Sequence, residues 1–566
     1  MATNKMRSKS VQGKTLFFVT SPRTPFKTIP EIALLDEHLH GELWCPETQS
    51  KFYRLLREHD FFEGDEAKDT AFAGRDRINR IPKQLGFVSL PIIGLTPVGV
   101  EFVESNNKEE ILLRQLLKFQ IPSPYHPLGK SAADFCVKPY LELFRLIREL
   151  GHLAYDELHI FGMQLINYHH YDTIVQKIRH FRLLKEKTKG NYKRLKDHIF
   201  LVEAQHIYRD EIIAKNFRTR ESKTDTEIEF LKKKIRNMRD YADAAIRNLR
   251  STGLVKVTAI GKTLSIMPER IADVDFFLST IDREPCFVKD QERYENYLWS
   301  TTIPRLLTDD REGIIKKLDV EFGVTVEPNI SLNTLKDILN NEIEKNKEHK
   351  IEEQVRELKD YSLYDDIEKV FDTMESSYEP SLFFEWNTWR AMTMLDGGTI
   401  KANLKFDDMG APMSTALGKM ADIECYYDDF DMIVEVSRSS GALQFKMEGE
   451  PVPRHIGIHK EQTNKPTYCF FIAPTINPAT VAHFYSLYIS NVELYGGKCR
   501  IIPMTLDLFR KMLNDAVNSR TKPTPQNIKA LFDMSYQYAK ECVMNDGTEV
   551  DWYSMVTSML DNWLAV

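Results

Sequence analysis

Acidic residues recur in the segment from Ala421 to His455, which reads ADIECYYDDFDMIVEVSRSSGALQFKMEGEPVPRH. Its first half predicts a β-hairpin, because two apolar runs flank a polar turn at Asp428 and Asp429. Asp422 and Glu435 are equally far from that turn, so the hairpin places them opposite each other, with Cβ atoms roughly 4.5–5.5 Å apart. Like charges at that distance repel unless a cation lies between them. Carboxylate oxygens are the ligands of hard divalent ions, and the spacing therefore predicts a metal site.

Two more acids are placed to join such a site. Glu448 follows Glu435 by 13 residues on a helix predicted behind the hairpin, and Glu385 in FFEW lies on the helix before it. Divalent ions held by such acids activate water and neutralise developing charge in phosphodiester hydrolysis. The simpler alternative is that Asp422 and Glu435 are exposed strand residues whose charges are only solvated.

The elements that position these acids form a mixed α/β pattern after Pro380. A helix (LFFEWNTWRAMTML), a strand (TIKANLKF) and the hairpin come first. A mainly helical stretch to Glu461, a buried strand (TYCFFIAP), a helix (PATVAHFYSLYISN) and a strand (CRIIPMT) follow. An α-β-β-β-α-β order with acids on the second and third strands is the arrangement of the PD-(D/E)XK nuclease core. We therefore expect a nuclease domain over residues 379–566.

One position departs from that motif. The usual lysine, two residues after the second acid, is replaced here by Ser437, which supplies no cation to position the water. Lys446 in QFKME is a candidate to replace it from the adjacent helix, and the alternative is a surface or phosphate-contacting lysine. His455 and His459 have a metal-compatible spacing, but no third nitrogen or thiolate ligand lies nearby in the sequence. We assign them to packing or to supporting contacts.

The N-terminal half carries a helix-and-wing pattern more than once. The clearer copy, Asp240 to Glu269, has an amphipathic helix ended by Gly253 and two short strands joined at Gly261, which describes a winged helix. A second copy runs from Ala73 to Glu104, and a third candidate from Tyr140 to Arg182. Arginine suits both guanine recognition and phosphate contact, although each arginine has a structural ion pair as its alternative role. The candidate DNA-binding residues are Arg23, Arg75, Arg77, Arg80, Arg247 and Arg250.

Charge is unevenly distributed along the chain. The net charge is −7, but residues 171–262 carry 23 Lys and Arg against 12 Asp and Glu, a local charge of +11. A basic segment inside an acidic protein favours a polyanionic partner, and a solvated helical face is the alternative. From Ser331 to Pro380 a charged, helix-favouring stretch predicts long connecting helices. We therefore expect a DNA-recognition region over residues 1–275 and a helical linker over residues 276–378.

The remaining composition favours a cytoplasmic protein. The seven cysteines are scattered without a CxxC pair, which is typical of a reducing compartment and argues against a zinc ribbon. No apolar run approaches the about 20 residues that a membrane span needs, and the N-terminus has no apolar core of signal-peptide length.

The hairpin segment quoted above closely resembles the nuclease domain of the AlwI/BstNBI (MlyI/PleI-like) family of type IIS restriction and nicking endonucleases. The resemblance extends to FFEWNTW, FFIAPTIN and RIIPMTL, and to TSPRTPFKTIPE, AFAGRDRI and RNMRDYADAAIRNLRSTGL in the N-terminal half. It therefore covers nearly the whole chain. It implies a multidomain α+β fold with a mostly helical winged-helix recognition region, a helical linker and a C-terminal PD-(D/E)XK domain. The family's acidic site residues match Glu385, Asp422, Glu435 and Glu448.

The resemblance also implies an activity. It predicts a prokaryotic, Mg²⁺-dependent endonuclease that binds a short asymmetric sequence in double-stranded DNA and cuts at a fixed short distance outside it. One active site cuts one strand, so cutting both needs a transient homodimer through the nuclease domain or a separate cleavage subunit. Two alternatives remain open. One is a winged-helix DNA-binding regulator with a non-catalytic nuclease-like domain, and the other is a catalytic subunit that depends on a partner for recognition.

Overall fold

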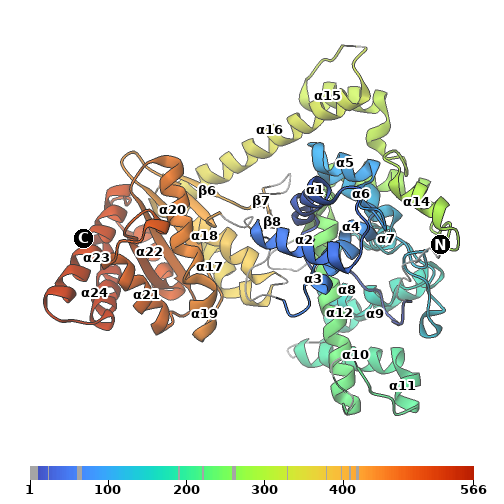
Figure 1. Ribbon diagram of the computed structural model, residues 1–566, viewed down its shortest axis with the longest axis horizontal. Coiled ribbons are helices and arrows are strands. Elements are labelled where there is room, and N and C mark those ends of the chain that lie inside the picture. Colours follow the sequence, from blue (N-terminus) through green and yellow to red (C-terminus); the bar gives the residue numbers. More distant parts are fainter. Residues whose placement is uncertain are drawn as a thin grey trace. The chain divides into compact units, whose positions relative to one another are not determined.

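The computed structural model describes residues 10–22, 24–59, 61, 67–188, 192–219, 222, 224–257, 263–327, 329–377, 379–396, 398–406, 410–415 and 420–565. The chain forms two compact units, Met1–Ile343 and Glu344–Val566 (Figure 1). The first is mostly helical and the second is built around a β-sheet, so the predicted mixed, helix-rich α+β fold is confirmed. The finer division into recognition region, linker and nuclease domain stays a prediction.

The first unit begins with a helical subdomain that carries a small hairpin. It comprises α1 (Thr28–Leu39), α2 (Pro46–Glu58), α3 (Thr70–Asn79), α4 (Ile81–Gln84), β1 (Val88–Ser89) and β2 (Gly94–Leu95), and α5 (Pro97–Glu104) follows. Gly86 has a φ of +78°, a conformation that favours glycine, and it makes the turn from α4 into the hairpin. An isolated bridge from Leu43 to Ile92 adds a third short stretch to this hairpin.

A second helix-and-hairpin subdomain brings together segments that are far apart in the sequence. It contains α7 (Pro139–Leu150), β3 (Leu153–Ala154), α8 (Tyr155–Ile160), α12 (Glu227–Arg250), β4 (Val255–Val257) and β5 (Thr263–Ile266). The three strands pair in the order β3-β5-β4. The segments Tyr140–Arg182 and Asp240–Glu269, which the sequence suggested as separate copies, therefore contribute to one sheet. The turn at Gly261 lies outside the described residues.

The basic segment forms a helical insertion between α8 and α12. Its helices are α9 (Tyr171–Lys187), α10 (Tyr192–Ile207) and α11 (Arg209–Ile213). A small apolar cluster attaches α10 and α11 to α12, and its buried members are Ala204, Tyr208, Phe230 and Leu231. The positive charges are therefore presented on helices that have a core of their own.

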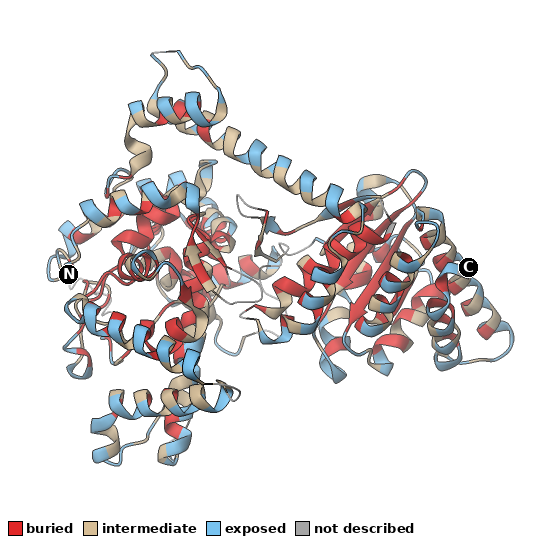
Figure 2. Ribbon diagram, turned by 180° about the vertical axis from the view of Figure 1, so that it is seen from behind, coloured by how far each residue is buried: buried red, intermediate tan, exposed pale blue. Residues whose placement is uncertain are grey.

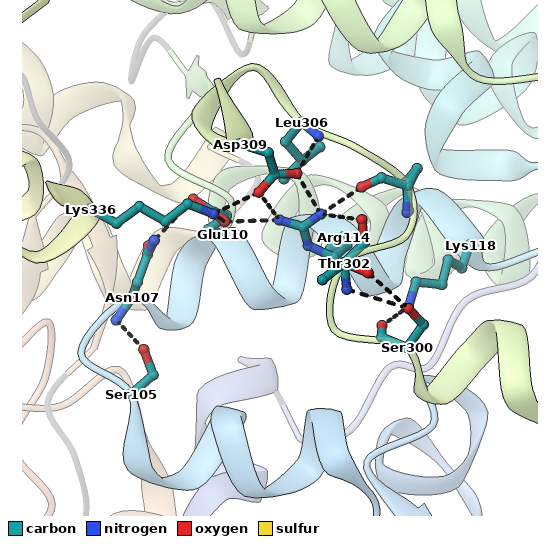
Figure 3. Close-up of polar contacts among 11 residues, drawn as sticks. Ser105, Asn107, Glu110, Arg114, Lys118, Ser300, Thr302, Leu306, Asp309 and Lys336 are labelled. Atoms are coloured by element: carbon teal, nitrogen blue, oxygen red, sulfur yellow. Dashed lines mark hydrogen bonds and ion pairs between the residues drawn. The ribbon is translucent and has the colours of Figure 1, made fainter. Parts of the chain in front are cut away.

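A buried ionic network closes the first unit (Figure 3). Arg114 on α6 (Lys108–Lys118) donates to the carbonyl oxygens of Thr302 (3.1 Å) and Pro304 (2.6 Å), and it pairs with Asp309 (3.0 Å) and Glu110 (2.9 Å). The Nζ of Lys336, on α16 (Leu332–Lys359), lies 2.7 Å from both carboxylates. The part of the chain that follows α13 (Ile271–Thr280), and that contains α14 (Gln291–Trp299) and α15 (Arg311–Phe322), is thereby attached to α6.

Replacing Arg114 by alanine is expected to lower the free energy of unfolding of the first unit by about 3–5 kcal/mol, because it removes one of the two cations that pair with the carboxylates of Glu110 and Asp309, together with the donor to two carbonyl groups. Equilibrium unfolding in denaturant measures the change. Arg148→Ala is the matched control, because Arg148 pairs with Asp275 at 2.7 Å on the surface. An exposed pair of this kind contributes about 0–1 kcal/mol. Equal effects of the two substitutions would contradict the prediction.

The second unit is a five-stranded mixed sheet with helices on both faces. The strand order is β12-β11-β10-β9-β6, and the strands are β6 (Thr399–Ala402), β9 (Ile423–Tyr426), β10 (Asp431–Val436), β11 (Thr467–Ala473) and β12 (Ile501–Thr505). β10, β11 and β12 are parallel, whereas β9 is antiparallel to both β6 and β10. The strands from β9 to β12 are almost entirely buried (Figure 2). A separate two-stranded sheet joins β7 (Lys405–Phe406) and β8 (Pro412–Ser414).

Apolar side chains hold helices against both faces of this sheet. The helices of the second unit are α17 (Tyr364–Thr373), α18 (Pro380–Asp396), α19 (Gly441–Glu448), α20 (Pro451–Thr463), α21 (Pro478–Ile489), α22 (Leu506–Asn518), α23 (Pro525–Met544) and α24 (Glu549–Asp561), and several of them pack directly on the strands. One core cluster joins Ile433 and Phe471 of the sheet to Ile456 of α20 and Phe484 of α21. On the other face, Phe532 of α23 stacks against the aromatic rings of Tyr468 and Phe470. None of the described helices is long and apolar enough to cross a membrane.

The predicted hairpin is confirmed, and so is its register. Ile423 pairs with Val434 and Tyr426 pairs with Asp431 across β9 and β10. The same pairing, continued by one residue, places Asp422 opposite Glu435. Because side chains alternate along a strand, Glu435 lies on the sheet face that α20 covers, together with Ile433 and Asp431.

Candidate functional site: a buried carboxylate cluster

The four predicted acids lie in one cluster within the second unit. Glu435 is on β10 and 6% exposed, Asp422 directly precedes β9, Glu448 is the last residue of α19, and Glu385 is on α18 and 8% exposed. The negative charges of Glu448 and Glu385 both act on Glu435, and those of Glu435 and Glu448 both act on Asp422. Residues that are up to 63 positions apart in the sequence thus share one electrostatic environment.

The orientation of Glu385 follows from the way α18 is fixed. The indole N–H of Trp389 donates to the carbonyl oxygen of Ile400 on β6 (3.1 Å). Two residues earlier, the side chain of Asn387 donates to the carbonyl oxygen of Ile367 on α17 (2.9 Å). These buried bonds lock the rotation of α18 about its axis, because each would be lost if the helix turned. They hold the face that carries Glu385 in place.

Three hydrogen bonds order the other acids. The backbone N–H of Val436 donates to Oδ2 of Asp422 (2.8 Å), and the hydroxyl of Ser437 donates to Oε1 of Glu448 (2.6 Å). The Nδ1 of His455 lies 2.7 Å from Oε1 of Glu435. Pro451 stands at the first position of α20, where its missing N–H costs nothing, and His455 follows one turn later.

Burial and mutual repulsion disfavour the charged forms of two acids in the cluster. Burial raises the pKa of Glu435 well above its usual range, and the charges of Glu448 and Glu385 raise it further, against a smaller opposing effect of Arg454. Burial also raises the pKa of Asp422, with Glu435 and Glu448 acting in the same direction and the Val436 N–H opposing them. Several carboxylates that cannot all be charged without a counter-ion form a site that attracts a cation.

The donor set fits a hard divalent ion. All its candidate ligands are carboxylates, which suit Mg²⁺, Ca²⁺ or Mn²⁺ better than softer metals. Among the described residues, no group of three or more His, Cys, Asp or Glu side chains is arranged to hold a metal ion. Mg²⁺ commonly takes only one or two carboxylates and completes its shell with water and substrate phosphates. The assignment of Asp422, Glu435 and Glu448 as metal ligands stays a prediction.

Ser437, at the modified motif position, and Lys446, its candidate replacement, have different environments. Ser437 is buried and its hydroxyl binds Glu448, so it orders an acid instead of supplying a charge. Lys446 is exposed, and it stands two positions from both Gln444 and Glu448, which corresponds to the opposite side of α19. The proposed replacement of the motif lysine by Lys446 stays a prediction, and its position favours a contact with something outside this chain.

The sequence predicts packing or supporting contacts for His455, and the structure shows it in direct contact with Glu435. The sequence did not identify Glu435 as the partner. His459 lies one turn further along α20, with Nε2 3.3 Å from Asp431 and Nδ1 4.0 Å from Glu424. The i, i+4 spacing of the two histidines was the available signal, because it places both on the helix face that meets the acidic side of the hairpin.

Loss of the His455 contact is expected to weaken cleavage without abolishing it. His455→Ala removes the group that orients Glu435, and removing the partner of a metal-ligating side chain typically costs about 10–100-fold in activity or metal affinity. Single-turnover cleavage at several metal concentrations measures both quantities. Unchanged rates at every metal concentration would show that the bond is structural only.

The predicted DNA-binding arginines occupy different environments. Arg75 is exposed beside the ring of Phe72, whereas Arg77 pairs with Glu31 at 2.8 Å and Arg80 pairs with Asp76. Arg23 lies outside the described residues. On α12, Arg247 donates to the carbonyl oxygen of Thr20 (3.3 Å), and Arg250 is only 3% exposed. Their role in DNA binding stays a prediction, and Arg75 is the most accessible of those described.

A cluster of buried acids beside two antiparallel strands, in a unit separate from two helix-and-hairpin subdomains, is the arrangement expected of a DNA-cleaving hydrolase. The sequence profile of the AlwI restriction endonuclease family matches residues 83–512, about three quarters of the chain. The chain therefore belongs to the AlwI restriction endonuclease family, as its sequence predicted. It is a site-specific DNA endonuclease, and DNA is its partner. Enzymes of this family generally use a divalent metal ion.

Solved structures of restriction enzymes are similar to parts of the chain. The small subunit of the heterodimeric restriction endonuclease R.BspD6I is 23% identical over 36% of this chain and 96% of its own, with a TM-score of 0.28. The BpuJ1 endonuclease binding domain, solved with modified DNA, is 12% identical over 51% of this chain and 96% of its own, with a TM-score of 0.33. FokI is 12% identical over 92% of this chain and 99% of its own, with a TM-score of 0.23. No curated protein matches the chain.

Proposed function

We propose that this endonuclease is of the type IIS kind: it binds a short asymmetric DNA sequence with its first unit and cuts outside that sequence with the second. The observation that carries the proposal is the location of the whole acid cluster in one compact unit, Glu344–Val566. The helix-and-hairpin subdomains belong to the other unit. Recognition and cleavage are thus assigned to separate parts of the chain, which cutting at a distance requires.

The chemistry we propose is Mg²⁺-dependent hydrolysis in a PD-(D/E)XK-type domain. Asp422 and Glu435, with Glu448, would hold the ion, which when bound activates a water and neutralises charge on the leaving oxygen. His455 holds Glu435 and Ser437 holds Glu448 in the orientations described above. Glu435 and Glu385 are 6% and 8% exposed, and the limited access of bulk water to them strengthens their electrostatic contacts.

We propose that the two helix-and-hairpin subdomains of the first unit act as winged helices on duplex DNA. The strand order β3-β5-β4 and the placement of α12 directly before β4 support this proposal. Helices α9 to α12 carry the local positive charge that would contact phosphates. All seven cysteines are free, which fits the reducing cytoplasm of a prokaryote, where we place the enzyme.

Cleavage of supercoiled plasmid with Mg²⁺, followed by run-off sequencing of both strands, tests the proposal. Breaks at a fixed distance from one short asymmetric sequence are the expected result. Breaks inside the recognised sequence would overturn the type IIS assignment. The absence of cleavage on DNA of diverse sequence, with binding retained, would instead support the alternative of a DNA-binding regulator with a non-catalytic nuclease-like domain.

A further inference from the structure

The acid cluster lacks a positive charge at the motif position. The PD-(D/E)XK motif supplies this charge with a lysine, but here the position holds Ser437, whose hydroxyl binds Glu448. Lys446 stands on the side of α19 opposite to Gln444 and Glu448. A metal ion neutralises part of the charge that develops during hydrolysis, and a positioned cation on the phosphate oxygens stabilises more of it. We therefore expect such a cation on another element.

Arg454 lies beside the cluster on α20. It directly precedes His455, whose Nδ1 is 2.7 Å from Oε1 of Glu435. Successive residues of a helix are rotated by roughly 100° about its axis, so Arg454 and Ile456 flank His455 on opposite sides. Ile456 is fully buried in the core, whereas the side chain of Arg454 is 27% exposed. Arg454 therefore projects from α20 on the solvent side of His455.

The charge of Arg454 acts on the cluster. Burial and two neighbouring carboxylates raise the pKa of Glu435, and among the described residues Arg454 is the cation that lowers it. The guanidinium and the acids therefore share one electrostatic environment, which a scissile phosphate enters when a metal ion binds it there. Because a guanidinium always stays protonated in proteins, it supplies its positive charge at every working pH.

The guanidinium of Arg454 is held through one nitrogen. Its Nε donates to both carboxylate oxygens of Glu450, at 2.9 Å and 3.3 Å. No described residue accepts a hydrogen bond from its Nη1 or Nη2, and these are the planar donors that match the oxygens of a phosphate. Arg438, in the loop after β10, differs, because its Nε and Nη2 already bind the two oxygens of Glu375 at 2.9 Å and 2.5 Å. Arg454 is thus oriented and still has donors available.

We propose that Arg454 is the catalytic cation of this endonuclease, and that its Nη groups bind the non-bridging oxygens of the scissile phosphate in place of the motif lysine. Glu450 holds Nε and so positions these groups before DNA binds. This inference rests on the proposed function, because it needs a phosphodiester at the acid cluster. In the reaction, water gives a hydroxyl group to phosphorus and a proton to the leaving oxygen, whose bond to phosphorus breaks. The guanidinium stabilises the negative charge that grows on the phosphate oxygens and keeps its own protons.

The test compares the full-length wild type with Arg454→Ala and Arg454→Lys in single-turnover cleavage with Mg²⁺ and in binding to the same labelled DNA. Arg438→Ala is the matched control, because the side chain of Arg438 is 32% exposed and also pairs with a carboxylate. Lys446→Ala tests the other candidate for the motif lysine. Thermal unfolding reports whether each variant folds. Arg454→Gln, which retains a side-chain donor for Glu450, replaces the alanine variant if that variant does not fold.

Arg454→Ala should lower the single-turnover rate by about 10²-fold or more and change the Kd for DNA only slightly. Arg454→Lys should recover part of the rate, because lysine keeps the charge but lacks the planar donors. The Mg²⁺ concentration that gives the half-maximal rate should not rise, because removing a cation beside carboxylates favours the binding of another cation. Free guanidinium ion, far below denaturing concentrations, should restore part of the cleavage by Arg454→Ala, whereas sodium ion at equal ionic strength should not.

A rate for Arg454→Ala within a few-fold of the wild type overturns the proposal, and so does an equal loss in Arg438→Ala or Lys446→Ala. A loss that comes with a raised Mg²⁺ requirement, or that neither lysine nor guanidinium recovers, also overturns it, because Arg454 would then only support the acids. If the wild type cuts no DNA, the proposed function fails and this inference fails with it. A wild type that cuts beside an equally active Arg454→Ala removes the inference alone.

Discussion

Replacing Glu435 by glutamine should abolish DNA cleavage while leaving the fold and DNA binding intact. Glu435 is the acid on which the others converge, since Glu448, Glu385 and His455 all act on it. Glutamine keeps the size of the side chain and an oxygen that accepts a hydrogen bond, but it removes the negative charge that a divalent ion needs. Metal-ion catalysis is worth several kcal/mol, so the single-turnover rate should fall by about 10³-fold or more.

The matched control is Glu461→Gln. Glu461 is an exposed acid on α20, the helix that also carries His455. Both variants are compared with the wild type in plasmid cleavage and in binding to the same labelled DNA. Cleavage should be lost only in Glu435→Gln. If that variant cuts at the wild-type rate, the carboxylate cluster is not the active site, and if it loses binding with cleavage, the substitution has disturbed more than the metal site.

The part of the site that was predictable from the sequence is the part that depends on short-range geometry. The turn at Asp428 and Asp429 sets the register of β9 against β10, and the observed pairing of Ile423 with Val434 follows from it. Register in a hairpin is fixed by the turn and by which face is buried, and both can be read from a few residues. The opposition of Asp422 and Glu435 is a consequence of the same local rule.

The contacts that the sequence did not predict depend on packing between distant segments. The bond between His455 and Glu435 requires α20 to cross the hairpin at one particular position. Likewise β3 pairs with β5 although 110 residues separate Leu153 from its partner Leu264, and no local pattern encodes that pairing. Arginine spacing was equally ambiguous, because a guanidinium suits a buried carboxylate as well as a phosphate.

Replacing Asp422 by asparagine should abolish cleavage and at the same time stabilise the metal-free protein at neutral pH. Burial and the neighbouring carboxylates raise the pKa of Asp422, so its charged form is costly in the folded state. Asparagine retains an oxygen that can accept the hydrogen bond from Val436 N–H, and it carries no charge. For a unit of this size, each kcal/mol that the substitution adds to the free energy of unfolding raises Tm by about 2–4 °C. The loss of cleavage should match that of Glu435→Gln.

The sign of the pH dependence follows from the direction of the shift. A carboxyl group whose pKa is raised on folding stabilises the folded state below its unfolded pKa of about 4, and that stabilisation is lost as the pH rises through the folded pKa. The wild type should therefore lose stability relative to Asp422→Asn as the pH rises from about 4 toward neutrality. At lower pH the two proteins should unfold at similar temperatures, because Asp422 is then protonated in both states.

Adding Mg²⁺ should make the wild type more stable than Asp422→Asn at neutral pH. An ion that binds only the folded protein raises its stability by mass action, so the Tm of the wild type should rise with Mg²⁺ concentration. Asp422→Asn has lost a carboxylate ligand and should respond little. Thermal unfolding of the two proteins at pH 4 to 8, with Mg²⁺ or with a chelator, measures the stability difference without metal, its pH dependence and the response to Mg²⁺. A wild type that is more stable than Asp422→Asn without metal at neutral pH would contradict the argument, since the buried charges would then be satisfied by the protein itself.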